Sequence, residues 1–144
     1  MVENDTVKLL RECDAGVKMA VSSFDDVLDK VESEKLHQML EKSKEQHADL
    51  GGRIARALLE VGDEGKDPNP MAKGMSWMKS MVKMTVDNSD KTAADLMTDG
   101  CDMGVKSLSR YLNQYSAADE NSKNITKDLI KVELDLLTGL REFL

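Results

Sequence analysis

The sequence predicts an all-α protein, a bundle of four long helices, on three observations. Apolar residues make up 40% of the chain and aromatic residues only 3%, which is too apolar for a disordered chain and too poor in aromatic residues for a β-fold. The two prolines, Pro68 and Pro70, lie in one short stretch, so the rest of the chain lacks the strongest helix breaker. Four long segments carry apolar residues at steps of three and four, which is the period of a helix with one buried face.

The first two predicted helices form a hairpin over residues 5–61. The first helix begins near Asp5, and the second begins after Ser33, a residue type that caps helix N-termini. Only a few residues separate the two apolar patterns, so the helices should pack antiparallel. The first stripe is Leu10, Cys13, Val17, Val21, Phe24, Leu28 and Val31, and the second is Leu36, Leu40, Ser43, His47, Leu50, Ile54, Leu58 and Val61.

The middle of the chain, residues 62–88, is predicted to be a loop followed by a short connecting helix. The loop, GDEGKDPNP, has two glycines, two prolines and no apolar residue. The connecting helix is rich in methionine, with one face made of Met71, Met75, Met78 and Val82. If it continued to Tyr115 it would be about 70 Å long, at ~1.5 Å per residue, so we expect a break before a new helix that Asn88 or Ser89 caps.

The last two predicted helices form a second hairpin over residues 89–144, separated by the polar stretch 116–121. Their stripes are Ala94, Met97, Cys101, Val105, Leu108, Leu112 and Tyr115, and Ile125, Leu129, Val132, Leu136, Leu140 and Phe143. Two hairpins joined by a long connection make one four-helix-bundle domain over residues 1–144.

Charge and composition exclude several classes of protein. The net charge is −7, and an acidic surface repels phosphate backbones, so no binding of nucleic acid is expected. There is no run of about 18 apolar residues that would span a membrane. The N-terminus, MVENDTVKLL, does not read as a signal peptide, and two cysteines do not make a disulfide framework. We therefore expect a cytoplasmic protein.

A short motif occurs twice. Residues 13–20 read CDAGVKMA and residues 101–108 read CDMGVKSL, 88 positions apart. The stripes of the second and fourth helices also match, at a spacing of 89. Any two helical stripes align in some register, so coincidence stays open, but the repeated CDxGVK favours a duplicated hairpin.

Three stretches, HADLGGRIARALLEVG, WMKSMVKM and LMTDGCDMGVKSLSRYL, together with the repeated hairpin, carry a resemblance to a known family. The chain resembles the ferritin-like superfamily, which includes the rubrerythrins, and is most similar to a small bacterial group of ferritin-like domains of unknown function. The resemblance covers most of the chain. It implies a bundle in which one helix of each half gives a Glu to a di-metal site and the other gives Glu-x-x-His.

Carried over residue by residue, the metal-ligand positions of the family are Asp14, His47, Asp102 and Glu133. The second helix has Lys44 three residues before His47, and the fourth has Leu136 three residues after Glu133, so each half retains a different member of the Glu-x-x-His pair. A di-iron centre takes about four carboxylates and two imidazoles, and a lysine ammonium near the metal position would oppose a cation. The resemblance with these departures implies a degenerate site and favours a non-enzymatic protein.

Two interpretations of the candidate site remain open. His47 lies at the centre of its stripe and Glu133 well inside its own, so they could be a buried polar pair that hydrogen-bonds and needs no cofactor. Alternatively they belong to a weakened or mononuclear site for iron or another divalent metal. Asp14 lies at the edge of its stripe, and Asp102 about a quarter-turn off, towards solvent.

The cysteines and methionines are interpreted as packing residues. Cys13 and Cys101 should be small buried side chains and not a redox pair, because the neighbouring aspartates raise a thiol pKa. The methionines of the connecting helix should fill the core and not bind copper. This helix, residues 71–84, is also locally basic, and we expect it to mediate self-association into a homo-oligomer or binding of a protein partner.

Overall fold

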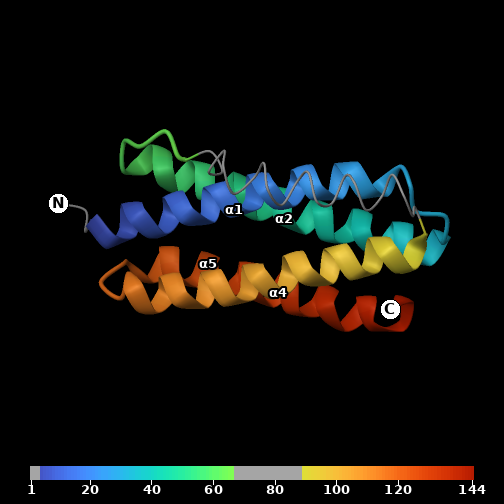
Figure 1. The fold of residues 1–144 in the computed structure, drawn as a ribbon. Helices are drawn as coiled ribbons and strands as arrows, with labels where there is room; N and C mark the ends of the chain where they lie inside the picture. Colours follow the sequence, from blue (N-terminus) through green and yellow to red (C-terminus); the bar gives the residue numbers. More distant parts are fainter. Residues whose placement is uncertain (1–3, 67–88) are drawn as a thin grey trace.

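A computed structural model describes residues 4–66 and 89–144 (Figure 1). These residues form four long α-helices and no strand, which confirms the predicted all-α bundle. The helices are α1 (Asn4–Leu28), α2 (Glu34–Glu60), α4 (Asp90–Gln114) and α5 (Glu120–Leu140), followed by a 3₁₀ turn at Arg141–Phe143. The predicted Met-rich helix, residues 71–84, lies outside the described residues. No described helix is long and apolar enough to cross a membrane.

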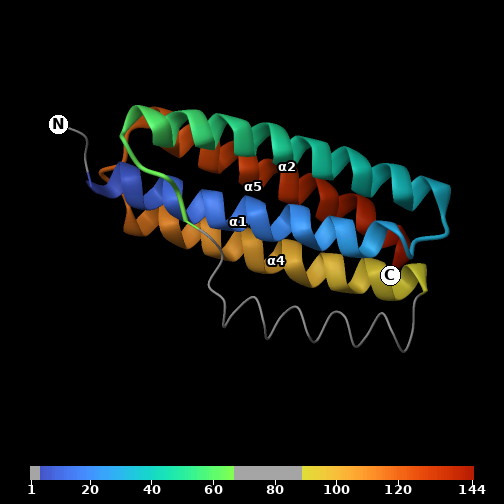
Figure 2. The ribbon, with the colours of Figure 1, turned by 90° about the horizontal axis from the view of Figure 1, so that it is seen from above.

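The four helices lie lengthwise beside one another (Figures 1 and 2). Helices α1 and α5 run in one direction along the bundle, and α2 and α4 run in the other. The strongest contacts join α1 to α2, α2 to α5, α5 to α4, and α4 to α1, so each helix packs between two antiparallel neighbours. Because α2 and α4 are parallel, the described chain leaves α2 at one end of the bundle and starts α4 at the other.

Side-chain caps fix the starts of three helices. The Ser33 hydroxyl accepts the N–H of Leu36, as the sequence predicts, and the Ser89 hydroxyl, one of the two predicted candidates, accepts that of Thr92. Asp119 caps α5 in the same way. The prediction that the first helix continues through Val31 is wrong, because α1 ends at Leu28.

The early end of α1 follows from a contact with a distant helix. The carboxylate of Asp90, in the first turn of α4, accepts the backbone N–H groups of Glu32 and Ser33 at 2.8 and 2.9 Å. These two N–H groups are therefore satisfied by α4 and not by a further turn of α1. The hairpin joint is fixed by an interaction across 57 to 58 positions of sequence, which periodicity does not reveal.

The buried apolar side chains form two separate clusters along the bundle. The Leu9 cluster contains Leu9, Leu10, Cys13, Val17, Leu50, Ile54, Ala57, Leu58, Leu108, Ala118, Ile125 and Leu129. The Phe24 cluster contains Phe24, Val27, Leu36, Leu40, Ala94, Met97, Cys101, Leu136 and Leu140. On every helix the change from one cluster to the other occurs near the middle.

Polar residues and a glycine lie at the level where the two clusters meet. We call this level the middle layer, and its members are Ser43 and His47 on α2, Gly104 on α4 and Glu133 on α5. Ser43, His47 and Glu133 are all buried. The bundle therefore has a polar layer between two apolar halves.

Candidate functional site

His47 is fixed in one orientation by its own helix. Its side chain is almost fully buried, with 1% of the residue exposed. Its Nδ1 lies 2.7 Å from the backbone carbonyl oxygen of Ser43, one turn earlier. Because a carbonyl oxygen only accepts hydrogen bonds, Nδ1 carries the proton and donates it to Ser43. The second ring nitrogen, Nε2, is thereby directed into the centre of the bundle.

Glu133 meets His47 from the opposite hairpin. Its Oε1 lies 3.3 Å from His47 Nε2. With Nδ1 protonated, Nε2 of a neutral ring is an acceptor, and so is an ionised carboxylate, so this contact requires a proton between the two atoms. Either Glu133 is a neutral acid that donates to the ring, or the ring is a cation that donates to the carboxylate. In both forms the pair holds one proton more than a neutral ring beside a free carboxylate.

The space for the Glu133 carboxyl group is provided by Gly104. A Cβ atom at this glycine would lie 2.8 Å from Cδ and 3.0 Å from Oε1 of Glu133, so no larger residue fits without movement. The other carboxyl oxygen, Oε2, is buried and has no hydrogen-bond partner among the described residues. The ring of Phe24 covers His47, with ring centroids 5.2 Å apart. Phe24 therefore lies against His47, and Gly104 lies against the carboxyl group of Glu133.

Asp14 does not join this pair, although it is buried. Its Oδ2 accepts the backbone N–H of Lys66 at 2.9 Å and lies 2.8 Å from the ammonium of Lys18. A Cβ at Gly65, which has φ of +94°, would meet the same carboxylate. Asp14 therefore holds the segment that follows α2 against α1.

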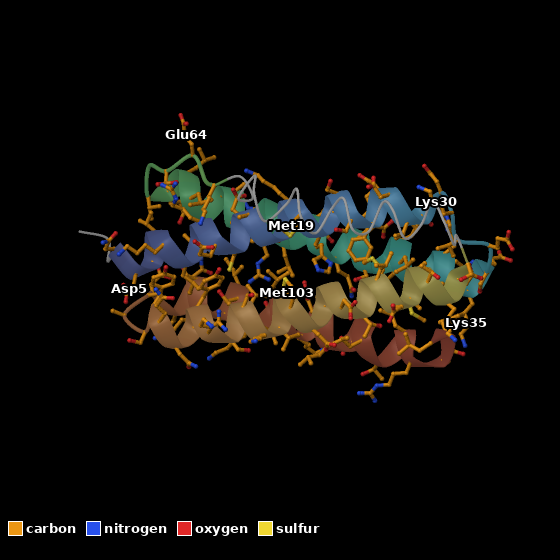
Figure 3. All side chains as sticks on the ribbon, in the orientation of Figure 1. Asp5, Met19, Lys30, Lys35, Glu64 and Met103 are labelled. Atoms are coloured by element: carbon orange, nitrogen blue, oxygen red, sulfur yellow. The ribbon has the colours of Figure 1, made fainter. Side chains whose placement is uncertain are left out.

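We call this segment, residues 62–66, the strap. Besides the Asp14 contact, its Lys66 pairs with Glu12, and Arg11 lies 3.4 Å from Asp63. Figure 3 shows Glu64 of the strap pointing away from the bundle. The strap and Lys18 of α1 together account for the side-chain contacts of Asp14 given above.

The other two residues considered near the metal position face outwards. Asp102 is exposed, as its place a quarter-turn off the stripe predicts. Lys44 pairs with Asp25 of α1, and this hydrogen bond raises the pKa of Lys44. The expectation that its ammonium lies near the metal position is therefore wrong, because the side chain reaches along the α1–α2 surface to a carboxylate.

The donor atoms that converge do not fit a di-metal centre. Of the four predicted ligands, only His47 and Glu133 come together, and no group of three or more His, Cys, Asp or Glu side chains suited to a metal occurs within 4–66 and 89–144. A structural or catalytic metal site usually takes at least three protein ligands, and a di-iron site more. Two donors would leave most coordination positions of even one ion unfilled by the described residues.

Both cysteines are buried free thiols, as expected. Burial raises the pKa of Cys13 to about 11, and its Sγ lies 3.2 Å from the hydroxyl of Thr126. Burial raises the pKa of Cys101 further, and the nearby carboxylates of Glu133 and Asp102 add to that rise. Neither thiol has the lowered pKa that a redox cysteine needs.

Sequence reasoning missed Gly104 as part of the site. A glycine inside a helix is unfavourable by about 1 kcal/mol relative to alanine, so its presence in the middle of a predicted helix is a signal of close packing. Gly104 is the glycine of the second copy of the repeated motif, CDMGVK. No sequence signal identifies the Ser43 carbonyl as the acceptor for His47.

Comparison of the chain with protein-family models, with curated proteins and with solved structures gives no match.

The surface of the described residues has a shallow groove between α2 and α5, crossed by an ion pair between Arg53 and Asp128 at 2.9 Å. Neither His47 nor Glu133 lines this groove. The polar pair is therefore a feature of the core and does not open into the groove.

Proposed function

We propose that this protein is a non-enzymatic, ferritin-like bundle with a degenerate di-metal site, which acts by self-association or by binding a protein partner. The observation that carries the proposal is the contact between His47 and Glu133 in the middle layer. The resemblance assigns both residues to the metal site, but here they hydrogen-bond to each other through one proton. The other two candidate ligands, Asp14 and Asp102, face the strap and the solvent.

The arrangement of the helices supports the ferritin-like assignment. Two antiparallel hairpins pack with every neighbouring pair antiparallel, and α2 and α4 run in the same direction. This is the up-down-down-up order that a bundle with one long crossover between its halves requires. In this proposal a proton takes the place of the metal cation. A shared proton needs only the two partners His47 and Glu133, whereas a metal ion needs further ligands.

For the contact with other chains we propose the predicted Met-rich helix, residues 71–84. The large exposed apolar side chains of the described residues are on separate helices, such as Leu59 on α2, Met103 on α4 and Leu134 on α5. Isolated exposed apolar residues are ordinary on protein surfaces. They give less reason for a specific interface than a helix with methionines on several faces beside lysines.

Self-association is tested by the mass in solution. Light scattering on the purified full chain should give a multiple of the 16.0 kDa chain mass. Replacing Met81 and Met84 by serine should lower that mass, and replacing the exposed Met103 by serine is the matched control that should not. A monomeric wild-type chain would exclude self-association and leave partner binding.

A second candidate function, binding of a single metal ion, is favoured by one specific observation. A histidine that binds a metal generally donates its other ring N–H to a carbonyl or carboxylate, and His47 donates Nδ1–H to the Ser43 carbonyl. Its Nε2 then faces Glu133, whose Oε2 has no hydrogen-bond partner in the part of the chain that the structure describes. A small cation with water ligands would use both groups, so the alternative concerns a weak mononuclear site.

Metal content separates the two candidates. After addition of Fe(II) in air, our proposal expects less than stoichiometric iron by elemental analysis and no new absorption band. Iron at one or more ions per chain that disappears in His47→Ala would establish metal binding at this site. His37→Ala is the matched control, since His37 lies at the surface near Glu41. Iron lost equally in both variants would be bound elsewhere.

A further inference from the structure

We propose that the middle layer divides the bundle into two cooperative units, and that the half around the Phe24 cluster opens while the half around the Leu9 cluster stays folded. This inference is independent of the proposed function, because it depends on the packing of the core and not on metal content or partners. The proposed opening is a conformational property of the bundle, and it follows from the division of the buried apolar side chains into two clusters at the middle layer.

The two halves are coupled weakly because their buried apolar side chains belong to separate clusters. Contiguous apolar packing is what makes a core unfold as one unit, and proteins open in contiguous parts where that packing is thin. At the middle layer the polar contacts given by the described residues are those of His47 with Ser43 and Glu133, beside the ring of Phe24 on His47 and the partly buried Val21 and Val132 that pack against the Leu9 cluster. Gly104 contributes no side chain there, and Oε2 of Glu133 makes no hydrogen bond within the described residues.

The Leu9 half is tied together across the two hairpins by buried or partly buried hydrogen bonds. The Thr6 hydroxyl, which is 1% exposed as a residue, accepts the N–H of Asp119 at 2.8 Å. Cys13 and Thr126 are in contact at 3.2 Å, in a buried setting. The strap adds the Asp14 contact on the same half of α1. Each such bond makes a net contribution to stability that is lost when the half opens.

In the Phe24 half the polar contacts between hairpins are more exposed. Lys35 and Glu142 form an ion pair at 2.8 Å, but their side chains are 66% and 52% exposed. An exposed ion pair contributes little to stability. Asp90 accepts two N–H groups of the joint between α1 and α2 at the outer end of this half. This half should therefore open at lower free energy.

Opening of the Phe24 half has a consequence for the surface of the protein. It exposes apolar side chains that are fully buried in the closed bundle, among them Phe24, Leu36, Leu40 and Leu140. The Leu9 half keeps the two hairpins joined at the other end. The same chain thus has a closed state and a partly opened state with a large apolar surface.

Native-state hydrogen exchange tests this proposal, because α2 and α5 each cross the middle layer. In the wild-type chain, amides of α2 at residues 38–42 should exchange at least tenfold faster than those at residues 51–57, which is the ratio that a difference of about 1.4 kcal/mol in opening free energy gives. Amides of α5 at residues 135–139 should likewise exchange faster than those at 125–131. Equal protection on both sides of the layer would overturn the proposal.

Two mild core substitutions test whether the halves are separate units. Ile125→Val, in the Leu9 cluster, removes one methyl group and should raise exchange about fivefold in the Leu9 half only. Val27→Ala, in the Phe24 cluster, should raise exchange in both halves, because complete unfolding includes opening of the Phe24 half. If Ile125→Val raises exchange equally in both halves, the bundle is one cooperative unit and the proposal fails.

Discussion

The two copies of CDxGVK have the same sequence but different surroundings. The cysteines behave alike, since Cys13 and Cys101 are both buried. The aspartates do not, because Asp14 is buried under the strap and Asp102 is exposed. In the first hairpin the chain that leaves α2 lies across α1 and donates the Lys66 N–H to Asp14. The motif therefore places a cysteine on the buried face of each helix, whereas the contacts of its aspartate depend on whether another segment of the chain crosses the helix there.

The same contrast holds in the middle layer. At the spacing that aligns the hairpins, His47 corresponds to Leu136 and Lys44 corresponds to Glu133. Lys44 turns outwards to Asp25, whereas Glu133 turns inwards to His47. The first hairpin thus contributes the imidazole and the second the carboxyl group, and the pair joins the two.

Breaking the pair should have the largest effect. His47→Leu leaves Glu133 buried without its partner, and we expect a loss of about 3–5 kcal/mol in the free energy of unfolding at neutral pH. The double variant with Glu133→Leu removes both polar groups and should recover most of that loss, because two leucines join the apolar clusters. Urea unfolding of the four proteins in this cycle measures the coupling. A double variant as unstable as His47→Leu alone would contradict a partnership between these residues.

Much of the fold and part of the site follow from periodicity. Steps of three and four place His47 and Glu133 on buried faces and Asp102 towards solvent, and the structure agrees. Local capping chemistry predicts the cap at Ser33, and it narrows the cap of α4 to Asn88 or Ser89, of which the structure has Ser89. Periodicity fixes a residue's face when the residue is central to a stripe or far from it.

What the sequence does not reveal depends on contacts between distant segments. Asp14 lies at the edge of its stripe, where a side chain can turn inwards or outwards, and a strap 52 positions away decides its place. Lys44 is equally ambiguous until Asp25 is known to lie beside it. A resemblance supplies positions along a helix, but it does not supply the partners that compete for each side chain, such as the Lys66 N–H for Asp14 and Asp25 for Lys44.

The glycines of the repeated motif give the next largest effect and a matched control. Gly104→Ala should destabilise the protein by about 1–3 kcal/mol, because the added Cβ overlaps the Glu133 carboxyl group. Gly16 occupies the same motif position in α1, where an added Cβ meets no atom within 4 Å. Gly16→Ala should therefore stabilise by about 0.5–1 kcal/mol through helix propensity. Thermal unfolding of both variants checks the opposite signs, and equal signs would contradict the proposed fit.

The aspartates of the motif should differ by a smaller amount. Asp14→Asn removes the ion pair with Lys18 and weakens the acceptor for the Lys66 N–H, so we expect a loss of about 1–2 kcal/mol. Asp102→Asn changes an exposed residue and should stay within about 0.5 kcal/mol of the wild type. Urea unfolding measures both. Equal losses would mean that the strap contact does not stabilise the fold.

The two cysteines of the wild-type chain should react with a thiol reagent at different rates. At pH 8 both native thiols are protonated, because burial raises the pKa of Cys13 to about 11 and that of Cys101 still further. Reaction with a thiol reagent then requires opening. Cys101 belongs to the Phe24 cluster and Cys13 to the Leu9 cluster, so Cys101 should react on the order of tenfold faster, although its native pKa is the higher of the two.

The pH dependence of this reaction identifies the state that reacts. An opened state presents an ordinary thiol, so the rate of reaction should level off above a pH of about 8.5. Direct attack on native Cys13 would instead continue to accelerate up to a pH of about 11, since the raised pKa keeps the folded thiol protonated until then. Cys13→Ala and Cys101→Ala, each leaving one thiol, assign the two rates by mass spectrometry. Faster reaction of Cys13 would contradict the proposed order of opening. It would mean that the Leu9 half, which has the buried hydrogen bonds between the hairpins, opens more readily than the Phe24 half.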